Sequence, residues 1–194
     1  MGIFLAANCA QPAALVSPMA TTLKDEGNRL FSDGDMAGAV GKYQEAVAAV
    51  GDAEGDEEKA LLAVLHCNMG ACYLSLNEHE KVVSHCTTAL ELNPSYEKAL
   101  VRRAKAAEAL KKYNDAVEDT KKLVELSPES KHYRNELARL ERDNAAYQEA
   151  QKDEMMSKLK EMGNSLLGKF GMSLDNFQAT KDPNTGSYSI NFKQ

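Results

Sequence analysis

Two pairs of polar residues have the types and the spacing to hold an anion. Lys24 and Asn28 are four residues apart, as are Lys98 and Arg102. On a helix this spacing puts both side chains of a pair on one face. Lysine and arginine make charge-assisted hydrogen bonds to carboxylates, and an asparagine amide adds further donors. These residue types therefore suit a peptide terminus, where two carboxylates lie close together.

A repeat of 34 residues provides the helices that position these pairs. Small residues at fixed places and a proline near the end of each unit are typical of helix–turn–helix repeats. A nine-residue insertion precedes the second unit, and the first contains Gly27 in the expected place. We expect three units, at about 20–53, 63–96 and 97–130. The matched positions are Gly70 with Ala104, Val82 with Ala116, Leu92 with Leu126 and Pro94 with Pro128.

These units resemble the tetratricopeptide repeat, and the resemblance implies an all-α solenoid of three repeats. In stacked helical hairpins the first helices line the concave surface side by side. Asn68 stands 34 residues before Arg102, at the same repeat position. We therefore expect both polar pairs and Asn68 to converge on one groove.

All five groove positions carry the residue types of the two-carboxylate clamp of co-chaperone tetratricopeptide domains. This resemblance implies a non-catalytic adaptor that binds a peptide ending in Glu-Glu-Val-Asp, the C-terminus of Hsp90 or Hsp70. Arg102 would hold the acidic residues upstream of the terminal aspartate. Its guanidinium has a forked set of donors that lysine lacks. The terminal carboxylate and the aspartate side chain would be held by Lys24, Asn28, Asn68 and Lys98.

A second resemblance lies in the C-terminal region, where residues 158–167, 170–177 and 186–192 are similar to the tetratricopeptide repeat protein 1 family. This similarity implies an alternative function, a signalling scaffold that contacts small or heterotrimeric GTP-binding proteins through the C-terminal helix and tail. Members of that family typically carry a long acidic N-terminal region that is absent here. We therefore interpret the chain as a short form or a fragment.

The composition narrows the function further. The chain has 194 residues and a net charge of −6, which argues against binding nucleic acid through overall charge. Residues 97–112 nevertheless carry six basic and two acidic side chains, so we expect a local basic helix beside the anion groove. The sequence contains no Gly-rich phosphate loop or nucleophile elbow, so we expect neither an enzyme nor a cofactor.

The cysteines form no CxxC motif, and we interpret them as free thiols in a reducing, cytoplasmic compartment. Cys67 and Cys72 are five residues apart and do not share a helix face. Three histidines lie nearby, so spacing alone leaves a metal site open. We favour ordinary positions on the repeat helices and assign no metal. The residues concerned are Cys9, Cys67, Cys72, Cys86, His66, His79 and His85.

Residues 1–19 are expected to form a disordered leader. The apolar stretch at 1–17 is interrupted by polar residues and lacks a positively charged start, which is typical of neither a membrane span nor a signal peptide. Gly2 suggests myristoylation, but Ala6 leaves that motif incomplete.

Local signals predict where the helices begin. Thr22 opens a pattern like a capping box, so we expect the first helix to start there. Ser95 and Ser127 are expected to be the N-caps of later helices. The acidic stretch 51–58 is expected to be a loop that runs into an extended second-repeat helix, whose first turn its acids favour.

The sequence after Pro128 has the period of one long amphipathic helix, which we expect over 131–169 as a cap on the last repeat. We interpret its Met155, Met156 and Met162 as core residues rather than as a binding surface. The tail at 170–194 contains a strong turn at 182–186 and then the alternation Tyr188, Ile190, Phe192. We expect this tail to be extended, and docked because it is too apolar to stay solvated.

Overall fold

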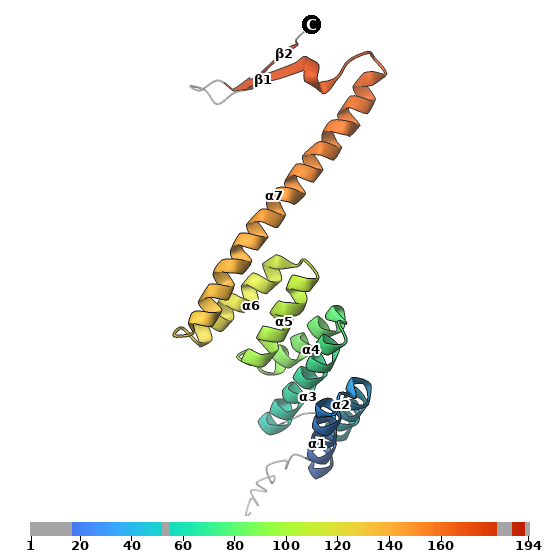
Figure 1. Cartoon of the computed structure of the whole chain (residues 1–194), viewed down its shortest axis with the longest axis vertical. Coiled ribbons are helices and arrows are strands. Elements are labelled where there is room, and N and C mark those ends of the chain that lie inside the picture. The colour runs from blue at the N-terminus through green and yellow to red at the C-terminus, as the bar shows by residue number, and fades with distance from the viewer. Residues whose placement is uncertain (1–16, 52–54, 182–187, 193–194) are drawn as a thin grey trace, which may run out of the picture. The chain divides into compact units, whose positions relative to one another are not determined.

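A computed structural model describes residues 17–51, 55–181 and 188–192 of the chain. In this part the chain forms seven α-helices and one two-stranded hairpin (Figure 1). Residues 1–16 of the predicted leader at 1–19, with Cys9, and the turn at 182–186 lie outside it. Pro18 and Met19 belong to the first helix, so the end of that leader prediction is wrong. The elements are α1 (Pro18–Ser32), α2 (Met36–Val50), α3 (Asp56–Ser75), α4 (His79–Leu92), α5 (Glu97–Ala109), α6 (Tyr113–Leu126), α7 (Lys131–Gly168), the 3-10 turn η1 (Leu174–Asn176), β1 (Phe177–Lys181) and β2 (Tyr188–Phe192).

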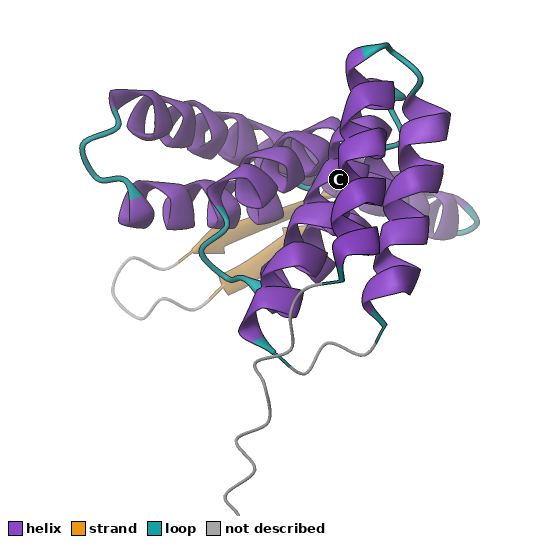
Figure 2. Cartoon of the chain, turned by 90° about the horizontal axis from the view of Figure 1, so that it is seen from below, coloured by secondary structure: helices purple, strands orange, loops and turns teal. Residues whose placement is uncertain are grey.

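The chain divides into two compact units, one up to Glu141 and one from Arg142. In the first unit the helices pack as three consecutive hairpins, α1 with α2, α3 with α4 and α5 with α6 (Figure 2). Helix α3 also contacts α5, so the first helices of the second and third repeats lie side by side. This arrangement confirms the predicted all-α fold of three helix–turn–helix repeats.

Small residues allow the helices of each hairpin to pack closely. A Cβ added at Gly27 of α1 would lie 2.5 Å from the ring of Tyr43 on α2. The equivalent Gly70 of α3 faces Cys86 of α4, where an added Cβ would lie 2.8 Å from the sulfur. The repeat positions predicted from spacing are therefore the points where paired helices cross.

The start of α7 caps the third repeat. Leu140 is buried in a cluster with Ala104, Ala107 and Ala116. Arg139 donates to both oxygens of Glu108 on α5, at 2.7 and 2.9 Å. These contacts all lie before residue 142, so the first turns of α7 belong to the repeat unit.

The acids predicted to favour the start of the second-repeat helix are in place, but the predicted start of the first helix is wrong. Helix α3 begins with Asp56, and Glu58 accepts a hydrogen bond from the Gly55 backbone N–H at 2.9 Å, as a helix start rich in acids should. Helix α1 instead begins at Pro18, four residues before the predicted start. The Thr22 hydroxyl donates to the Pro18 carbonyl inside the helix, at 3.0 Å, so the capping box is wrong.

The two serine caps are also wrong. Tyr96 holds the N-cap position of α5, while the Ser95 hydroxyl donates to Asn93 at 3.1 Å. The Ser127 hydroxyl donates to Glu97 on α5, at 2.9 Å, and α7 begins four residues later. At both positions the serine hydroxyl donates to a nearby acceptor and does not cap the helix that the sequence pattern predicted.

The second unit contains the rest of α7 and the hairpin. After α7 the chain reverses at Gly171, whose φ of 70° favours glycine. The Leu174 backbone N–H then donates to the Asn164 side chain at 2.6 Å, which returns the chain to the helix. Strands β1 and β2 pair antiparallel, with Phe177 opposite Phe192, which confirms the extended tail.

The interpretation of the α7 methionines as core residues is wrong. Of the residues in α7, all of which the structure describes, only Leu140 is buried. Met155, Met156 and Met162 are exposed, and Phe170, which we expected to be docked, is 76% exposed. The periodic apolar face is present on the helix, but the other residues that the structure describes do not cover it. Docking of the remaining tail side chains stays a prediction.

Candidate peptide-binding site

One pocket brings together three of the five predicted site residues. Asn28 of α1, Asn68 of α3 and Arg102 of α5 line a cavity of about 230 Å³, which also touches Tyr43 of α2. The three residues come from the first helices of three successive repeats. The predicted convergence of these helices on one groove therefore holds for the centre of the site.

A pair of hydrogen bonds fixes the amide of Asn28. The Tyr43 hydroxyl donates to Asn28 Oδ1 at 2.9 Å, and Asn68 Nδ2 donates to the same oxygen at 3.2 Å. Burial raises the pKa of Tyr43 to about 12, so its hydroxyl keeps its proton at neutral pH. Because the oxygen of Asn28 has two donors, its NH₂ group is the end left to meet a ligand, apart from a long 3.5 Å contact with Asp25.

The sequence analysis did not single out Tyr43 as a site residue. Its ring packs against Gly27, and any larger residue there would collide with it. Gly27 thus lets a residue of the second helix reach a polar group on the first. The signal was present in the small residue at the repeat position, but its partner could be named only from the structure.

Arg102 is held at the wall of the pocket. Its Nη1 donates to the Cys67 carbonyl at 3.2 Å and contacts the Cys67 sulfur. These contacts use one nitrogen of the guanidinium, which leaves the Nη2 and Nε donors for a ligand. Cys67 lies one residue before Asn68, so the site also depends on a backbone group that sequence reasoning missed.

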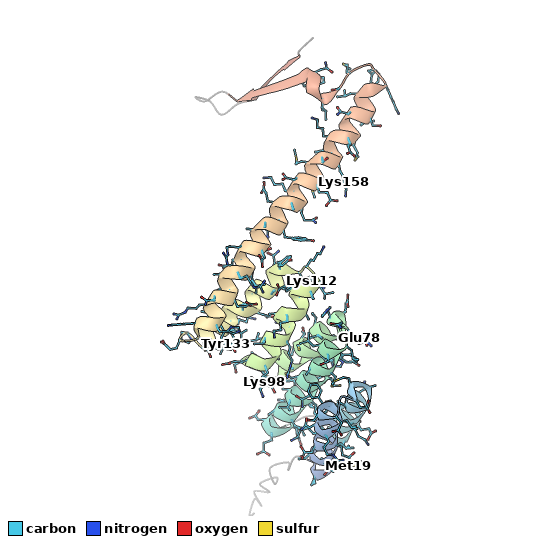
Figure 3. All side chains as sticks on the ribbon, viewed as in Figure 1. Met19, Glu78, Lys98, Lys112, Tyr133 and Lys158 are labelled. Atoms are coloured by element: carbon cyan, nitrogen blue, oxygen red, sulfur yellow. The ribbon has the colours of Figure 1, made fainter. Side chains whose placement is uncertain are left out.

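Lys24 and Lys98 do not line the pocket. Lys24 lies one helical turn before Asn28 on α1, and Lys98 lies one helical turn before Arg102 on α5. Lys98 is exposed (Figure 3). Lys24 is 3.6 Å from Asp25, which is itself largely exposed, so this ion pair is weak. Both ammonium groups sit on long chains and can reach a ligand that enters from solvent.

The predicted basic helix is only partly a groove feature. Arg103 makes two hydrogen bonds to the buried Asp119 of α6, at 2.7 and 2.8 Å, and a third to Thr87 at 3.0 Å. Its charge is neutralised away from the Asn28 pocket. The simple count of charges along 97–112 therefore overstates the positive potential of the site.

The cysteines and histidines form no metal cluster that the described residues reveal, since no group of three or more potential ligands lies together there. Cys67, Cys72 and Cys86 are buried free thiols. Burial raises the pKa of Cys72 to about 11 and that of Cys86 to about 12, which keeps both thiols neutral. Cys86 lies where α3 and α4 cross, and Cys67 and Cys72 belong to buried hydrophobic clusters, so all three are packing residues.

Comparison with known proteins supports the repeat assignment. Residues 63–96 and 97–130 each match the tetratricopeptide repeat. Protein PHOX1 of Arabidopsis thaliana is 36% identical over 113 residues, which are 57% of this chain and 14% of PHOX1. Human sperm-associated antigen 1 is 40% identical over 104 residues, 54% of this chain and 11% of the antigen. The chain therefore corresponds to a small part of these longer relatives.

Solved structures match the fold over most of their own length. The first tetratricopeptide domain of Spaghetti (RPAP3), bound to the Hsp90 peptide SRMEEVD, has 31% identity and a TM-score of 0.57, and covers 66% of this chain and 98% of that domain. The second domain of human RPAP3, in complex with the Hsp70 peptide SGPTIEEVD, has 32% identity and a TM-score of 0.54, with 63% and 95% covered.

The fold and the pocket together define a helical-repeat protein of the kind that mediates protein interactions. The chain belongs to the tetratricopeptide repeat family. Among the described residues, no helix is both long enough and apolar enough to span a membrane.

Proposed function

We propose that this protein is a non-catalytic adaptor that binds the acidic C-terminal peptide of Hsp90 or Hsp70. The observation that carries the proposal is the pocket in which Asn28, Asn68 and Arg102 meet. Similar tetratricopeptide domains have been solved with peptides that end in EEVD, which supports the same class of ligand here.

The terminal residue of the peptide would enter beside the two asparagines. The NH₂ of Asn28 points away from its two donors, and Asn68 has a second N–H beyond the one given to Asn28. Each can donate to a carboxylate oxygen without breaking the network. The site is therefore organised before the peptide arrives, which limits the side-chain entropy lost on binding.

The charged groups would surround this neutral centre. Lys24 and Lys98 would supply positive charge to the α-carboxylate and to the aspartate side chain, from the two sides on which they stand. Arg102 would bind the acidic residues upstream with the donors that Cys67 leaves unused. The asparagines would set the position of the terminus, and the cations would provide most of the affinity.

The proposal requires a free α-carboxylate on the peptide. In a calorimetric titration with SRMEEVD, amidation of the C-terminus should weaken binding more than removal of an upstream glutamate. An amide offers no charge to the lysines, whereas an upstream glutamate lies nearer the rim. Added salt should weaken the free acid more than the amide. Equal affinity for acid and amide would exclude the clamp.

Single substitutions should then assign the roles. Lys98→Ala and Arg102→Ala should each weaken peptide binding by about 1.5–3 kcal/mol, the range for hydrogen bonds to charged groups. Lys105→Ala is the matched control, because it removes an exposed cation from the same helix outside the pocket. Circular dichroism should be unchanged in all three. A variant that binds as the wild type does would remove that residue from the proposed clamp.

The finer assignment, to the tetratricopeptide repeat protein 1 family, rests on the similarity of the C-terminal segments. Scaffolding of GTP-binding proteins through that region is the alternative function. Deletion from Arg142 onward separates the two, because every residue of the pocket precedes Glu141. Chaperone-peptide binding should survive the deletion, and a tail-mediated scaffold should not. A cytoplasmic location would follow from either function and agrees with the free thiols.

A further inference from the structure

The second half of α7 carries a row of large apolar side chains that the protein leaves exposed. Each side chain of this row is between 58% and 76% exposed. None of them contributes to the pocket of the first unit. We call these residues the α7 stripe: Met155, Met156, Leu159, Met162, Leu166 and, two residues past the end of the helix, Phe170.

The spacing of the α7 stripe is that of a helix-pairing seam. Met155, Leu159, Met162 and Leu166 follow one another at intervals of four, three and four residues. This is the alternation of the two core positions in a coiled coil, held over two heptads. A helix that packs on a globular core shows a broader apolar face.

Within the described part of the chain, the α7 stripe is covered at one side only. Leu174 packs against Gly163, where an added Cβ would lie 2.5 Å from the leucine. Leu174, Met156 and Leu159 then line a wide, mainly apolar groove next to the stripe. This contact extends the apolar surface rather than closing it.

We propose that the α7 stripe is the interface between two copies of this chain, paired antiparallel. Six side chains of this size, each more than half exposed, present roughly 700 Å² of apolar surface, close to the ~800 Å² per partner of a standard interface. A second copy supplies an identical seam. Antiparallel pairing sets Met155 opposite Leu166 and Leu159 opposite Met162, so each layer is filled by side chains of similar size.

The charges beside the stripe favour antiparallel over parallel pairing. Residues 149–154 contain three acidic side chains and one basic, and residues 158–169 contain three basic and one acidic. In this antiparallel register residues 149–154 of one copy lie opposite residues 167–172 of the other, where Lys169 is the one charged side chain. Parallel helices would place like charge beside like charge along the whole seam. The pairs Glu149–Lys152 and Glu154–Lys158 within each helix leave no large net charge to oppose association.

The first test is the mass of the full chain in solution. Analytical ultracentrifugation should show a shift from monomer to dimer between about 5 and about 200 µM, the range of a small, non-obligate interface. Leu159→Glu should keep the protein monomeric throughout. Ala150→Glu, which adds the same charge half a turn around the helix, should dimerise as the wild type does. A wild type that stays monomeric, or a Leu159→Glu variant that still dimerises, would overturn the proposal.

Disulfide trapping tests the orientation. In a Cys9→Ser background the other cysteines are buried, so an added thiol reports on the stripe alone. Met155→Cys mixed with Leu166→Cys should form a cross-linked heterodimer on mild oxidation. Either variant alone should not, because antiparallel pairing separates identical positions by eleven residues, about 16 Å along the helix. Cross-linking of each variant to itself would overturn the antiparallel arrangement.

The dimer does not depend on the proposed peptide function. Leu159 lies in the second unit, so Leu159→Glu should bind SRMEEVD with the wild-type affinity at a concentration where the wild type is monomeric. The two proposals can therefore fail separately.

Discussion

The two units of this chain differ in how far their large apolar side chains are buried. In the repeat unit Tyr43, Leu65 and Leu100 are at most 1% exposed, whereas Leu159 and Met162 in the second unit are more than half exposed. Both sets lie on helices with a regular apolar face. Periodicity therefore shows which side chains share a face, and says nothing of whether that face has a partner.

The difference lies in what stands opposite each large residue. In the repeats a glycine of the paired helix faces a buried side chain, as Gly27 faces Tyr43 and Gly70 faces Cys86. In the second unit Gly163 receives Leu174, and the other described residues leave the rest of the apolar face exposed. Close packing needs complementary sizes on two surfaces, and only the repeats supply both.

The largest expected effect is a difference in the free energy of unfolding between alanine variants of two leucines in α7. Leu140→Ala removes a side chain that is 1% exposed and should lower the free energy of unfolding by about 2–5 kcal/mol. Leu159→Ala removes one that is 59% exposed and should change it by less than about 0.5 kcal/mol in the monomer. Urea unfolding of the two variants measures both. Similar losses would mean that the second half of α7 is packed in solution, and the comparison would fail.

Much of the repeat unit could be predicted because the repeat carries its own register. The 34-residue spacing aligned Asn68 with Arg102, and the structure places both in one pocket with Asn28. The strand at 188–192 was predicted because its alternation is local. In each case the information needed was a spacing within the sequence.

Two of the errors share a cause, which is competition from residues that are distant in sequence. Ser127 pairs with Glu97, thirty residues away, instead of capping a helix. Arg103 pairs with Asp119 on the next helix and leaves the groove. A hydroxyl or a guanidinium takes the best acceptor that the fold brings near. Such partners cannot be read from the local pattern.

Alanine substitutions at two glycines compare the stability effect at a covered helix surface with that at an open one. Gly27→Ala places a methyl group against the Tyr43 ring and should destabilise the protein by about 1–3 kcal/mol. Gly41→Ala, inside α2, meets nothing within 4 Å and should stabilise the protein by about 0.5–1 kcal/mol. Thermal unfolding distinguishes the two signs. Two substitutions of the same sign would show that helix propensity outweighs packing at the crossing.

Tyr43→Phe tests whether packing and binding can be separated in the repeat unit. The ring stays against Gly27, but Asn28 loses one of its two donors. The cost in stability should be about 0.5–1.5 kcal/mol. Binding of SRMEEVD should weaken as well, because only Asn68 then holds the Asn28 amide in place. Tyr43→Phe with unchanged peptide affinity would leave the hydroxyl a structural role only.

The smallest effect concerns the polar pair His66 and His85 in the repeat unit. Their Nδ1 atoms are 3.1 Å apart, so one ring donates and the other accepts. Burial lowers the pKa of both rings below the usual 6.5, helped by the charge of His85 at His66 and of Lys81 at His85. Each ring is therefore neutral in the folded protein at a pH where the unfolded chain has begun to take up protons.

The sign of the pH effect follows from this difference. Above pH 6.5 the two histidines are neutral in both the folded and the unfolded chain, and the pair makes its full contribution to stability. This contribution is lost as the pH falls from 6.5 through the lowered pKa values of the folded state. The Tm should fall between pH 7 and pH 5.5, and His85→Asn should reduce that fall. His132→Asn removes an exposed histidine outside the pair and should leave the fall as in the wild type. If His85→Asn and His132→Asn gave the same profile, the pair would not be the source of the pH dependence.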